Sequence, residues 1–369
     1  MKPRRLKILY VNYCLSIGGI ETMIAGLVTR LPKELFDISI AVFEGNGVLE
    51  KKLIEQGISI HYLNKREGLD FNALKSLFSI LKTEKIDVIH THNFSAWLYS
   101  ALAARFVLGV NVIHTEHSTV RGKKKRRYLA EWFLSYLTES IVAVSEKVKD
   151  NMVKFCHINP DKVLVIQNGI DVVTFQANTT FRSRVRKELA FSEKNVVFGT
   201  VGRLVPVKDH LTLINAFFEV YRLNPNAKLI IVGDGPMRKQ CLELISDLNL
   251  EDSVYLLGER HDIPQLLALM DIYTVSSLSE GMSISILEAM STGLPVVATN
   301  VGGNPEIVQQ DVNGLLVRSG DPKSLAEAMN KMSTDRLLRS QASVNSRKFV
   351  EKNYSDVAMM ARYQKLYSN

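Results

Sequence analysis

Short runs rich in β-branched and aromatic residues alternate with segments of helical periodicity, and this alternation limits the possible folds more than any other feature. The first half of the chain contains seven expected strands, at 7–11, 38–43, 58–63, 88–90, 110–115, 141–144 and 163–167. Helical patterns lie between them, for example at 21–31, 71–83 and 128–137. Such an alternation predicts right-handed crossovers and a parallel sheet with helices on both faces.

The pattern starts again in the second half. Its expected strands are 196–201, 228–232, 254–257, 272–275, 296–299 and 314–317. Segment 176–192 has few large apolar residues and no clear strand, so we expect a linker there. The sequence therefore predicts two doubly wound Rossmann-like α/β domains, residues 1–175 and 193–354, that face a cleft at the carboxyl ends of their strands. The last helix, about 355–369, is expected to pack back on the first domain.

Charge and cysteine content restrict the class of function. The formal net charge of +8 favours anionic partners, namely nucleotide phosphates, acidic lipid surfaces or nucleic acid. Cys14, Cys156 and Cys241 are far apart and lack metal-ligand spacing, which is typical of free thiols in a reducing cytosol. No stretch reaches the roughly 18 uninterrupted apolar residues of a spanning helix. We therefore expect a cytoplasmic protein.

Two glycine-containing loops follow expected strands. Gly18 and Gly19 open a helix, where free N–H groups can bind an anion, although a tight strand–helix turn also requires glycine. In the second half Gly202 ends a strand, Arg203 follows, and Lys208 lies five residues on. An arginine fork and a mobile lysine suit a diphosphate, although solvated loop cations give the same pattern. Neither loop has the G-x-G-x-x-G or Walker lysine of other nucleotide sites.

Two glutamates, Glu280 and Glu288, stand eight positions apart with Gly281 and Ser283 between them. Glu288 lies in an apolar helical run, so we expect it to be partly buried. A buried carboxylate needs a polar partner, and the hydroxyls of a ribose would serve. A pair of glutamates on a helix surface is the structural alternative.

These motifs, taken in order, resemble the family 4 glycosyltransferases, which have the GT-B fold of two Rossmann-like domains and transfer sugars with retention of anomeric configuration. The Glu280–Glu288 spacing looks like that family's E-x7-E signature. The other matching segments are 18–21, 87–92, 143–145, 168–171, 202–203 with Lys208, 233–236, 279–289, 293–298 and 302–303 with Glu306.

The resemblance implies roles for the residues that bind the donor phosphates and sugar. Arg203 and Lys208 would clamp the leaving diphosphate in place of a metal, which agrees with the lack of an Asp-x-Asp motif in the sequence. Glu280 would hold the transferred sugar, and Glu288 the ribose. His117, rather than His114, would point at the donor sugar. The remaining donor-binding positions are Gly19, Gly202, Gly233, Gly235, Arg260, Met282 and Ser283.

The implied function is a metal-independent retaining glycosyltransferase. It would move a hexose or N-acetylhexosamine from a UDP- or GDP-sugar to a glycan or lipid-linked acceptor, with the nucleotide sugar as co-substrate, no resident cofactor and the acceptor side in the first domain. The alternatives are a GT-B nucleotide-sugar epimerase and a non-catalytic, membrane-associated nucleotide-sugar-binding protein.

A basic run at 121–127 contains six cations in seven residues and leads into an aromatic and apolar helical stretch at 128–134. Its Lys123, Lys124, Lys125, Arg126 and Arg127 suit an anionic membrane surface, where each cation contributes about 1 kcal/mol, or a lipid-diphosphate acceptor. A solvated charge run beside a core-facing helix is the structural alternative. No nucleic-acid recognition module accompanies the run, so we expect no nucleic-acid partner.

Overall fold

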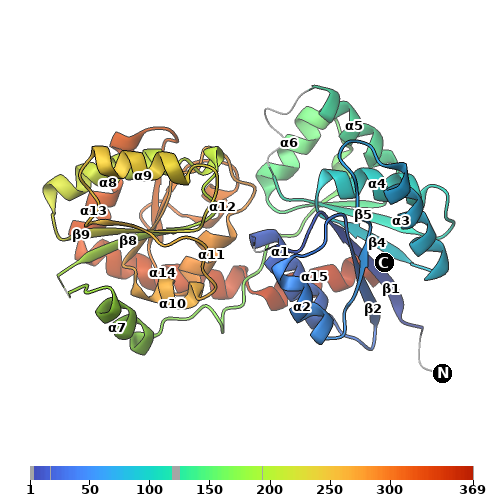
Figure 1. Cartoon of the computed structure of the whole chain (residues 1–369), viewed down its shortest axis with the longest axis horizontal. Helices are drawn as coiled ribbons and strands as arrows, with labels where there is room; N and C mark the ends of the chain where they lie inside the picture. The colour runs from blue at the N-terminus through green and yellow to red at the C-terminus, as the bar shows by residue number, and fades with distance from the viewer. Residues whose placement is uncertain (1–3, 17, 119–124, 193, 369) are drawn as a thin grey trace. The chain divides into compact units, whose positions relative to one another are not determined.

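The computed structural model describes residues 4–16, 18–118, 125–192 and 194–368. The chain forms two compact units. Unit 1 comprises Met1–Asn168 and Val357–Asn369, and unit 2 comprises Gly169–Asp356. Each unit has its own parallel sheet, and each is described below by itself (Figure 1).

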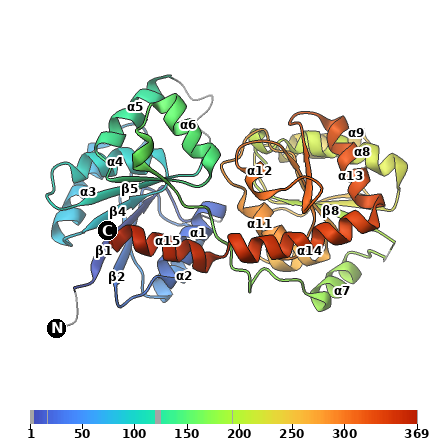
Figure 2. The same ribbon diagram turned by 180° about the vertical axis from the view of Figure 1, so that it is seen from behind.

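Unit 1 contains a seven-stranded parallel sheet. Its strands are β1 (Leu6–Asn12), β2 (Phe36–Val42), β3 (Ser59–Tyr62), β4 (Val88–Thr91), β5 (Asn111–Glu116), β6 (Ser140–Ala143) and β7 (Val163–Val165), in the order β3-β2-β1-β4-β5-β6-β7. Its helices are α1 (Gly19–Arg30), α2 (Val48–Glu55), α3 (Phe71–Thr83), α4 (Phe94–Ala104), α5 (Lys125–Tyr136), α6 (Glu146–Cys156) and α15 (Asp356–Ser368). Figures 1 and 2 show α1, α2 and α15 on one side of this sheet and α3, α4 and α5 on the other.

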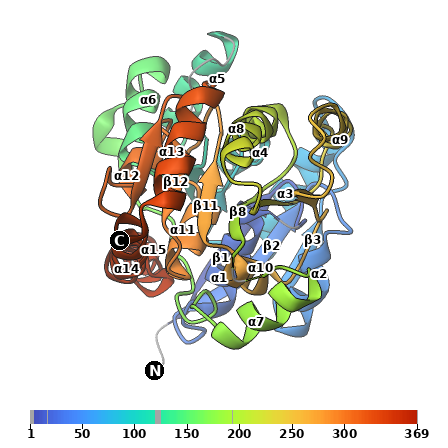
Figure 3. The ribbon, with the colours of Figure 1, turned by 90° about the vertical axis from the view of Figure 1, so that its left-hand side faces the viewer.

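Unit 2 repeats this architecture with six parallel strands. They are β8 (Val196–Val201), β9 (Ala227–Val232), β10 (Val254–Leu256), β11 (Ile272–Val275), β12 (Val296–Thr299) and β13 (Gly314–Val317), in the order β10-β9-β8-β11-β12-β13. Its helices are α7 (Thr179–Glu188), α8 (His210–Leu223), α9 (Arg238–Asp247), α10 (Ile263–Leu269), α11 (Ile284–Ser291), α12 (Asn304–Ile307), α13 (Pro322–Thr334) and α14 (Arg336–Asn353). Figures 1 and 3 show α8 and α13 on one face of the sheet and α10, α11 and α14 on the other.

The local sequence explains why these elements form. Strands of a parallel sheet are covered on both faces, so they consist of nearly continuous apolar runs, as in β12, whose four residues are all buried. Short polar side chains accept bonds from first-turn N–H groups of the helices, and each such cap is worth about 1 kcal/mol. These N-cap residues are Asp70, Asn93, Ser145, Asn178, Asp209, Asp321 and Asp335.

Every strand expected from the sequence is present, with small shifts at the ends; for example, β2 begins at Phe36 instead of residue 38. The prediction of two doubly wound Rossmann-like domains is confirmed. Within the described residues, no helix combines the length and apolarity needed to cross a membrane.

The segment expected as a linker contains helix α7, which belongs to unit 2. Arg182 and Arg186 of α7 both bind the carboxylate of Asp271, at 2.6 and 3.3 Å. Both guanidinium groups also donate to the carbonyl of Leu269, at the end of α10. The helix is held mainly by charged groups, so a search for apolar periodicity does not find it.

The last helix, α15, joins unit 1 through buried tyrosines. The hydroxyl of Tyr367 lies 2.6 Å from the hydroxyl of Tyr10 on β1 and 2.7 Å from Nδ1 of His90 on β4. One turn earlier, the hydroxyl of Tyr363 lies 3.3 Å from Oγ1 of Thr115 on β5. These contacts connect the end of the described chain to three central strands of the sheet.

Replacing Tyr367 by Phe should lower the free energy of unfolding of unit 1 by about 1–3 kcal/mol, because the Tyr10 hydroxyl and a His90 ring nitrogen would lose a buried partner. Urea denaturation followed by circular dichroism measures this change. Tyr136→Phe is the matched control, since its side chain is 65% exposed and should matter by less than about 0.5 kcal/mol. Equal stability of the two variants would refute the structural role of the Tyr367 hydroxyl.

Candidate active site

The residues predicted in unit 2 lie in loops that follow the carboxyl ends of neighbouring strands. Gly202 and Arg203 follow β8, Gly233 follows β9, and the Glu280 loop follows β11. These three strands are adjacent in the order β9-β8-β11. Their carboxyl ends therefore meet at one edge of the sheet, where doubly wound folds bind ligands.

A short ion pair connects two of these loops. Nζ of Lys208 lies 2.6 Å from Oε1 of Glu280, and the hydroxyl of Ser277 donates to the same oxygen at 2.6 Å. The exposed fractions of the Lys208 and Glu280 side chains are 27% and 10%. The hydroxyl of Ser276 also donates to the Lys208 carbonyl, at 2.9 Å. The loop after β8 is thus joined to the loop after β11 by both charge and hydrogen bonds.

Arg203 adds a positive charge that no carboxylate neutralises. Its side chain is exposed, and it forms no ion pair with any residue that the structure describes. Because Glu280 offsets the charge of Lys208, the group Arg203–Lys208–Glu280 has a net charge of about one positive unit. This edge of the sheet is therefore suited to an anion.

Two glycines allow the loops to approach this closely. Gly233 has φ +133°, and a Cβ there would lie 2.0 Å from the carbonyl oxygen of Gly202. Gly302, after β12, has φ +55°, and its Cβ would lie 1.5 Å from the carbonyl oxygen of Glu280. Side chains at these positions would push the Gly202 and Glu280 loops away. The close packing therefore holds both loops in place.

Gly235 and Arg260, two of the predicted donor-binding residues, have separate positions in this unit. Gly235 packs against the β8 loop, since a Cβ there would lie 2.5 Å from the Leu204 carbonyl oxygen. Arg260 lies in the loop after β10, where its guanidinium binds the carboxylate of Asp262 at 2.6 Å. Its side chain is 44% exposed. Gly235 thus has a packing role. Arg260 is paired with Asp262, which is not part of the Lys208–Glu280 pair.

Helix α11 begins beside Glu280. Met282 and Ser283 are buried, and Ser283 is the N-cap residue without a side-chain capping bond. The first N–H groups of a helix have no intrahelical partner, and they favour negative charge. The start of α11 therefore offers backbone donors in the same loop that holds Glu280.

Glu288 lies one turn further along α11, and Glu280 precedes the helix, so the two glutamates do not share a helix surface. The Glu288 side chain is partly buried. It forms no hydrogen bond or ion pair within the described chain, and burial raises its pKa from 4.5 to about 8. Its charge also helps to raise the pKa of Tyr273, after the larger effect of that residue's own burial. Glu288 is thus a carboxyl group with no protein partner in the described chain, and the hydroxyls of a ligand could supply one.

Sequence reasoning missed His210 and Ser277, which line a small pocket together with Lys208, Gly202 and Ser285. Burial and then the charge of Lys208 lower the pKa of His210 to about 4, so this ring is neutral at pH 7. Ser277 could have been found, because it comes two residues after β11 at the ligand-binding edge. His210 has no such signal, since it opens an ordinary amphipathic helix.

In unit 1, Gly19 is the exposed first residue of α1, a helix of 12 residues. His117 comes directly after β5 and is partly buried. Its Nε2 lies 3.0 Å from Nδ1 of His92, the residue that follows β4. Its Nδ1 has no hydrogen-bond partner in the described part of unit 1. His92 therefore holds the His117 ring through Nε2, and Nδ1 of His117 has no partner among the described residues.

Three buried histidines of this unit, His90, His92 and His117, have lowered pKa values. Burial lowers the pKa of His117 to about 4 and the pKa values of His90 and His92 well below their usual range. His114 is also buried, with its ring stacked on Trp97 at 4.0 Å between centroids. This stacking gives His114 a packing role, although Nε2 of His114 and Nε2 of His92, like Nδ1 of His117, have no hydrogen-bond partner in the described chain.

The basic run divides into parts with different surroundings. Lys123 and Lys124 lie outside the described residues. Lys125 and Arg126 begin α5 and are exposed. Arg127 binds the fully buried carboxylate of Glu131 at 2.5 Å, and its guanidinium stacks 3.4 Å from the ring centroid of Phe94. Arg127 is therefore held by a buried carboxylate of unit 1, while its side chain stays 29% exposed.

Comparisons with known proteins agree with this arrangement. The family described as Glycosyltransferase Family 4 matches residues 17–173, and that described as Glycosyl transferases group 1 matches residues 181–349. The chain is 30% identical to the UDP-Gal:alpha-D-GlcNAc-diphosphoundecaprenol alpha-1,3-galactosyltransferase of Escherichia coli, over 98% of this chain and 97% of that protein. It is 26% identical to the N-acetyl-alpha-D-glucosaminyl L-malate synthase of Bacillus anthracis, over 88% and 93% of the two chains.

The chain belongs to the family 4 glycosyltransferases. Its fold is similar to that of Anabaena HepE in complex with UDP-glucose, with a TM-score of 0.88, 24% identity and coverage of 99% of this chain and 100% of that one. The resemblance to the family and its GT-B fold, expected from the sequence, is therefore confirmed.

The raised pKa of Glu288 in this family 4 glycosyltransferase predicts a pH-dependent stability. The folded protein keeps a proton that the unfolded chain releases above pH 4.5, so the contribution of this group is fully present below pH 4.5 and is lost as the pH rises through about 8. Glu288→Gln should therefore be more stable than the wild type at pH 9, by about 1–3 kcal/mol, and similar to it at pH 4.5.

Urea denaturation at pH 4.5, 7 and 9 measures this difference. Glu327→Gln, which replaces an exposed carboxylate on α13 of the same unit, is the matched control and should not change the pH profile. If the Glu288→Gln profile is parallel to that of the wild type, Glu288 titrates near its ordinary pKa and the burial argument is wrong.

Proposed function

We propose that this glycosyltransferase moves a hexose or N-acetylhexosamine from a UDP-sugar to a glycan or lipid-linked acceptor, with retention of configuration and without a metal ion. The observation that carries the proposal is the Lys208–Glu280 pair at the carboxyl edge of the unit 2 sheet, with Arg203 left unneutralised beside it. The name of the E. coli relative includes UDP-Gal and a GlcNAc-diphosphoundecaprenol acceptor. That name supports a uridine nucleotide and a lipid-diphosphate-linked acceptor for this chain.

The donor diphosphate would interact with the cations and backbone donors of unit 2. Arg203 offers a planar fork and Lys208 a mobile charge. The first N–H groups of α11, near Met282 and Ser283, add fixed dipoles. Together these groups would stabilise the negative charge that grows on the leaving phosphate, which is commonly the largest single contribution to catalysis.

The other residues would position the donor. Glu288 would bind the ribose hydroxyls, because its carboxyl group lacks a partner in the described chain. Glu280, held by Lys208 and Ser277, would accept from hydroxyls of the transferred sugar. In unit 1 we assign Gly19 to the phosphates, and the available Nδ1 of neutral His117 to a sugar hydroxyl.

Retention follows if the acceptor hydroxyl attacks from the face that the diphosphate leaves. The oxygen of the departing phosphate then takes the acceptor proton, so no separate general base is needed. This route is compatible with the neutral state of His117 and His210, because neither ring has to carry a charge at pH 7.

Replacing Lys208 or Arg203 by Ala should lower kcat/KM. The expected loss of transition-state stabilisation is about 2–4 kcal/mol, the cost of losing one preorganised charge donor. Turnover of UDP-sugars with a lipid-diphosphate-linked acceptor, followed by nucleotide release, measures this. Lys239→Ala is the matched control, because its side chain is 86% exposed on α9. All assays contain excess EDTA, in which the wild type should keep its rate.

Two results would contradict the proposal. Near-wild-type kcat/KM in Lys208→Ala would remove the lysine from the diphosphate site. Loss of all activity in EDTA, with recovery on adding Mg²⁺ or Mn²⁺, would instead show that a metal supplies the electrophilic charge.

We also propose that α5 lies against an anionic membrane surface. Its exposed apolar side chains are spaced as one stripe of a helix and comprise Leu129, Trp132, Phe133 and Tyr136, which are 65%, 37%, 53% and 65% exposed. Lys125 and Arg126 precede this stripe and are also exposed. An apolar stripe flanked by cations is typical of helices that lie in the membrane interface.

Cosedimentation with vesicles tests this surface. Trp132→Gln/Phe133→Gln and Lys125→Gln/Arg126→Gln should each reduce binding to anionic vesicles, and wild-type binding should fall as salt rises, since exposed charges are screened beyond about 10 Å at 0.1 M. The control Leu69→Gln/Phe71→Gln removes two apolar side chains that are 76% and 78% exposed near α3. If all three variants sediment like the wild type, α5 has no membrane role.

A further inference from the structure

Unit 2 contains a second pocket at the opposite edge of its sheet. It has a volume of about 720 Å³ and lies at the amino ends of β8, β11 and β12, where Val196, Asp271 and Pro295 are on its wall. The Lys208 loops follow the carboxyl ends of the sheet, so the two sites are on different edges of the same sheet. A volume of this size is within the usual range for small-ligand pockets, about 300–1,000 Å³.

The wall of this pocket is strongly cationic. Its charged residues are Arg182, Arg186, Lys194, Arg336, Arg339 and Asp271. Five positive charges against one carboxylate leave an excess of four. Glu193, next to Lys194 in sequence, lies outside the described residues, and counting it would still leave an excess of three. Like charges around a concave surface attract an anion more strongly than the same charges on a flat one.

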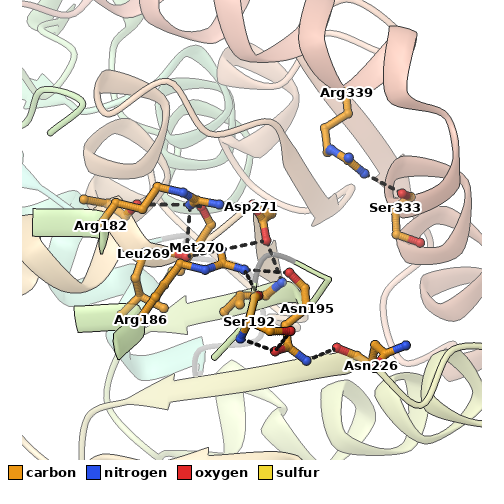
Figure 4. A network of polar contacts seen from close by, with 12 residues as sticks. Arg182, Arg186, Ser192, Asn195, Asn226, Leu269, Met270, Asp271, Ser333 and Arg339 are labelled. Atoms are coloured by element: carbon orange, nitrogen blue, oxygen red, sulfur yellow. Dashed lines mark hydrogen bonds and ion pairs between the residues drawn. The ribbon is translucent and has the colours of Figure 1, made fainter. Parts of the chain in front are cut away.

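Two of the cations have structural roles. Figure 4 shows Arg182 and Arg186 directed toward the same carboxylate of Asp271. Arg186 is 3% exposed, and its other bonds go to the carbonyls of Ser192 and Asn195 at 3.2 and 2.6 Å. Its Nε has no hydrogen-bond partner in the described chain. The buried guanidinium of Arg186, on the pocket wall, therefore has one N–H donor, at Nε, without a partner in the described chain.

The other three cations have no carboxylate partner in the described chain. Arg339, on α14, donates to the carbonyls of Met332 and Ser333 at the end of α13 (Figure 4). Lys194 and Arg336 are exposed and form no hydrogen bond or ion pair among the described residues. Neither side chain contributes to the hydrogen bonding of the described chain, so both are free to contact an anion.

We propose that this pocket binds a small soluble phosphate-bearing anion, at a site separate from the donor site. Arginine forks bind phosphate oxygens with two parallel bonds, and lysine adds a mobile point charge; Arg336, Arg339 and Lys194 all line this pocket. Asp271 neutralises one charge of the α7 arginines and leaves the pocket positive. A ligand in this pocket would contact residues of both α7 and the start of α14, which belong to unit 2.

The test is calorimetric titration with tripolyphosphate, with and without saturating UDP. The wild type should bind one equivalent that UDP does not displace, and Lys194→Gln/Arg336→Gln should bind it at least about tenfold more weakly. Neither substitution removes a bond that the fold uses, so the variant should stay folded. The control Lys323→Gln/Lys352→Gln removes two exposed cations from α13 and α14 and should bind like the wild type.

Two outcomes would overturn the proposal. One is the absence of tripolyphosphate binding in the presence of UDP. The other is binding that the double variant keeps at full strength; if that variant also loses anionic-vesicle sedimentation, these cations belong to a membrane surface. Neither outcome depends on turnover, so a failure here is distinct from a failure of the transferase proposal.

Discussion

Four loops approach closely at one edge of the unit 2 sheet, and their backbones pack so tightly that two of the contact positions have no room for a side chain. Gly233 lies against the Gly202 carbonyl and Gly302 against the Glu280 carbonyl, both with positive φ. Because these contacts fix the loops after β8 and β11, Lys208 and Glu280 meet at 2.6 Å although 72 positions separate them. The ion pair, the start of α11 and the position of Glu288 all follow from that packing.

The two units handle their buried polar groups in different ways. In unit 1 burial lowers the pKa of His90, and the hydroxyls of Tyr367 and Thr115 supply partners for its two ring nitrogens. Unit 2 instead pairs its charges, as in Lys208–Glu280 and in the two arginines on Asp271. Glu288 follows neither pattern, because it has neither a charge partner nor a hydrogen bond in the described chain. A polar group without a protein partner at a ligand-binding edge is expected where a ligand supplies the missing contact.

The strands and the fold could be predicted from the sequence, because strands buried on both faces leave continuous apolar runs such as β8 and β12. Helix α7 could not be predicted in this way, because Arg182 and Arg186 hold it through the carboxylate of Asp271 and through backbone carbonyls. Spacing identified Lys208 and Glu280 separately, but only the tertiary packing makes them a pair. The inward direction of Arg127 was equally hidden, because a run of six cations does not reveal which of them lies near a buried glutamate.

The bonds between α15 and the first unit have a consequence for the order in which the chain can fold. Ribosomes make Tyr10 and His90 early, but their partner Tyr367 is made only after the whole of unit 2. Unit 2 is continuous in sequence and can complete its sheet as it emerges. The unit that is synthesised first therefore lacks the partner of its Tyr10 hydroxyl and of Nδ1 of His90 until the last helix has been made.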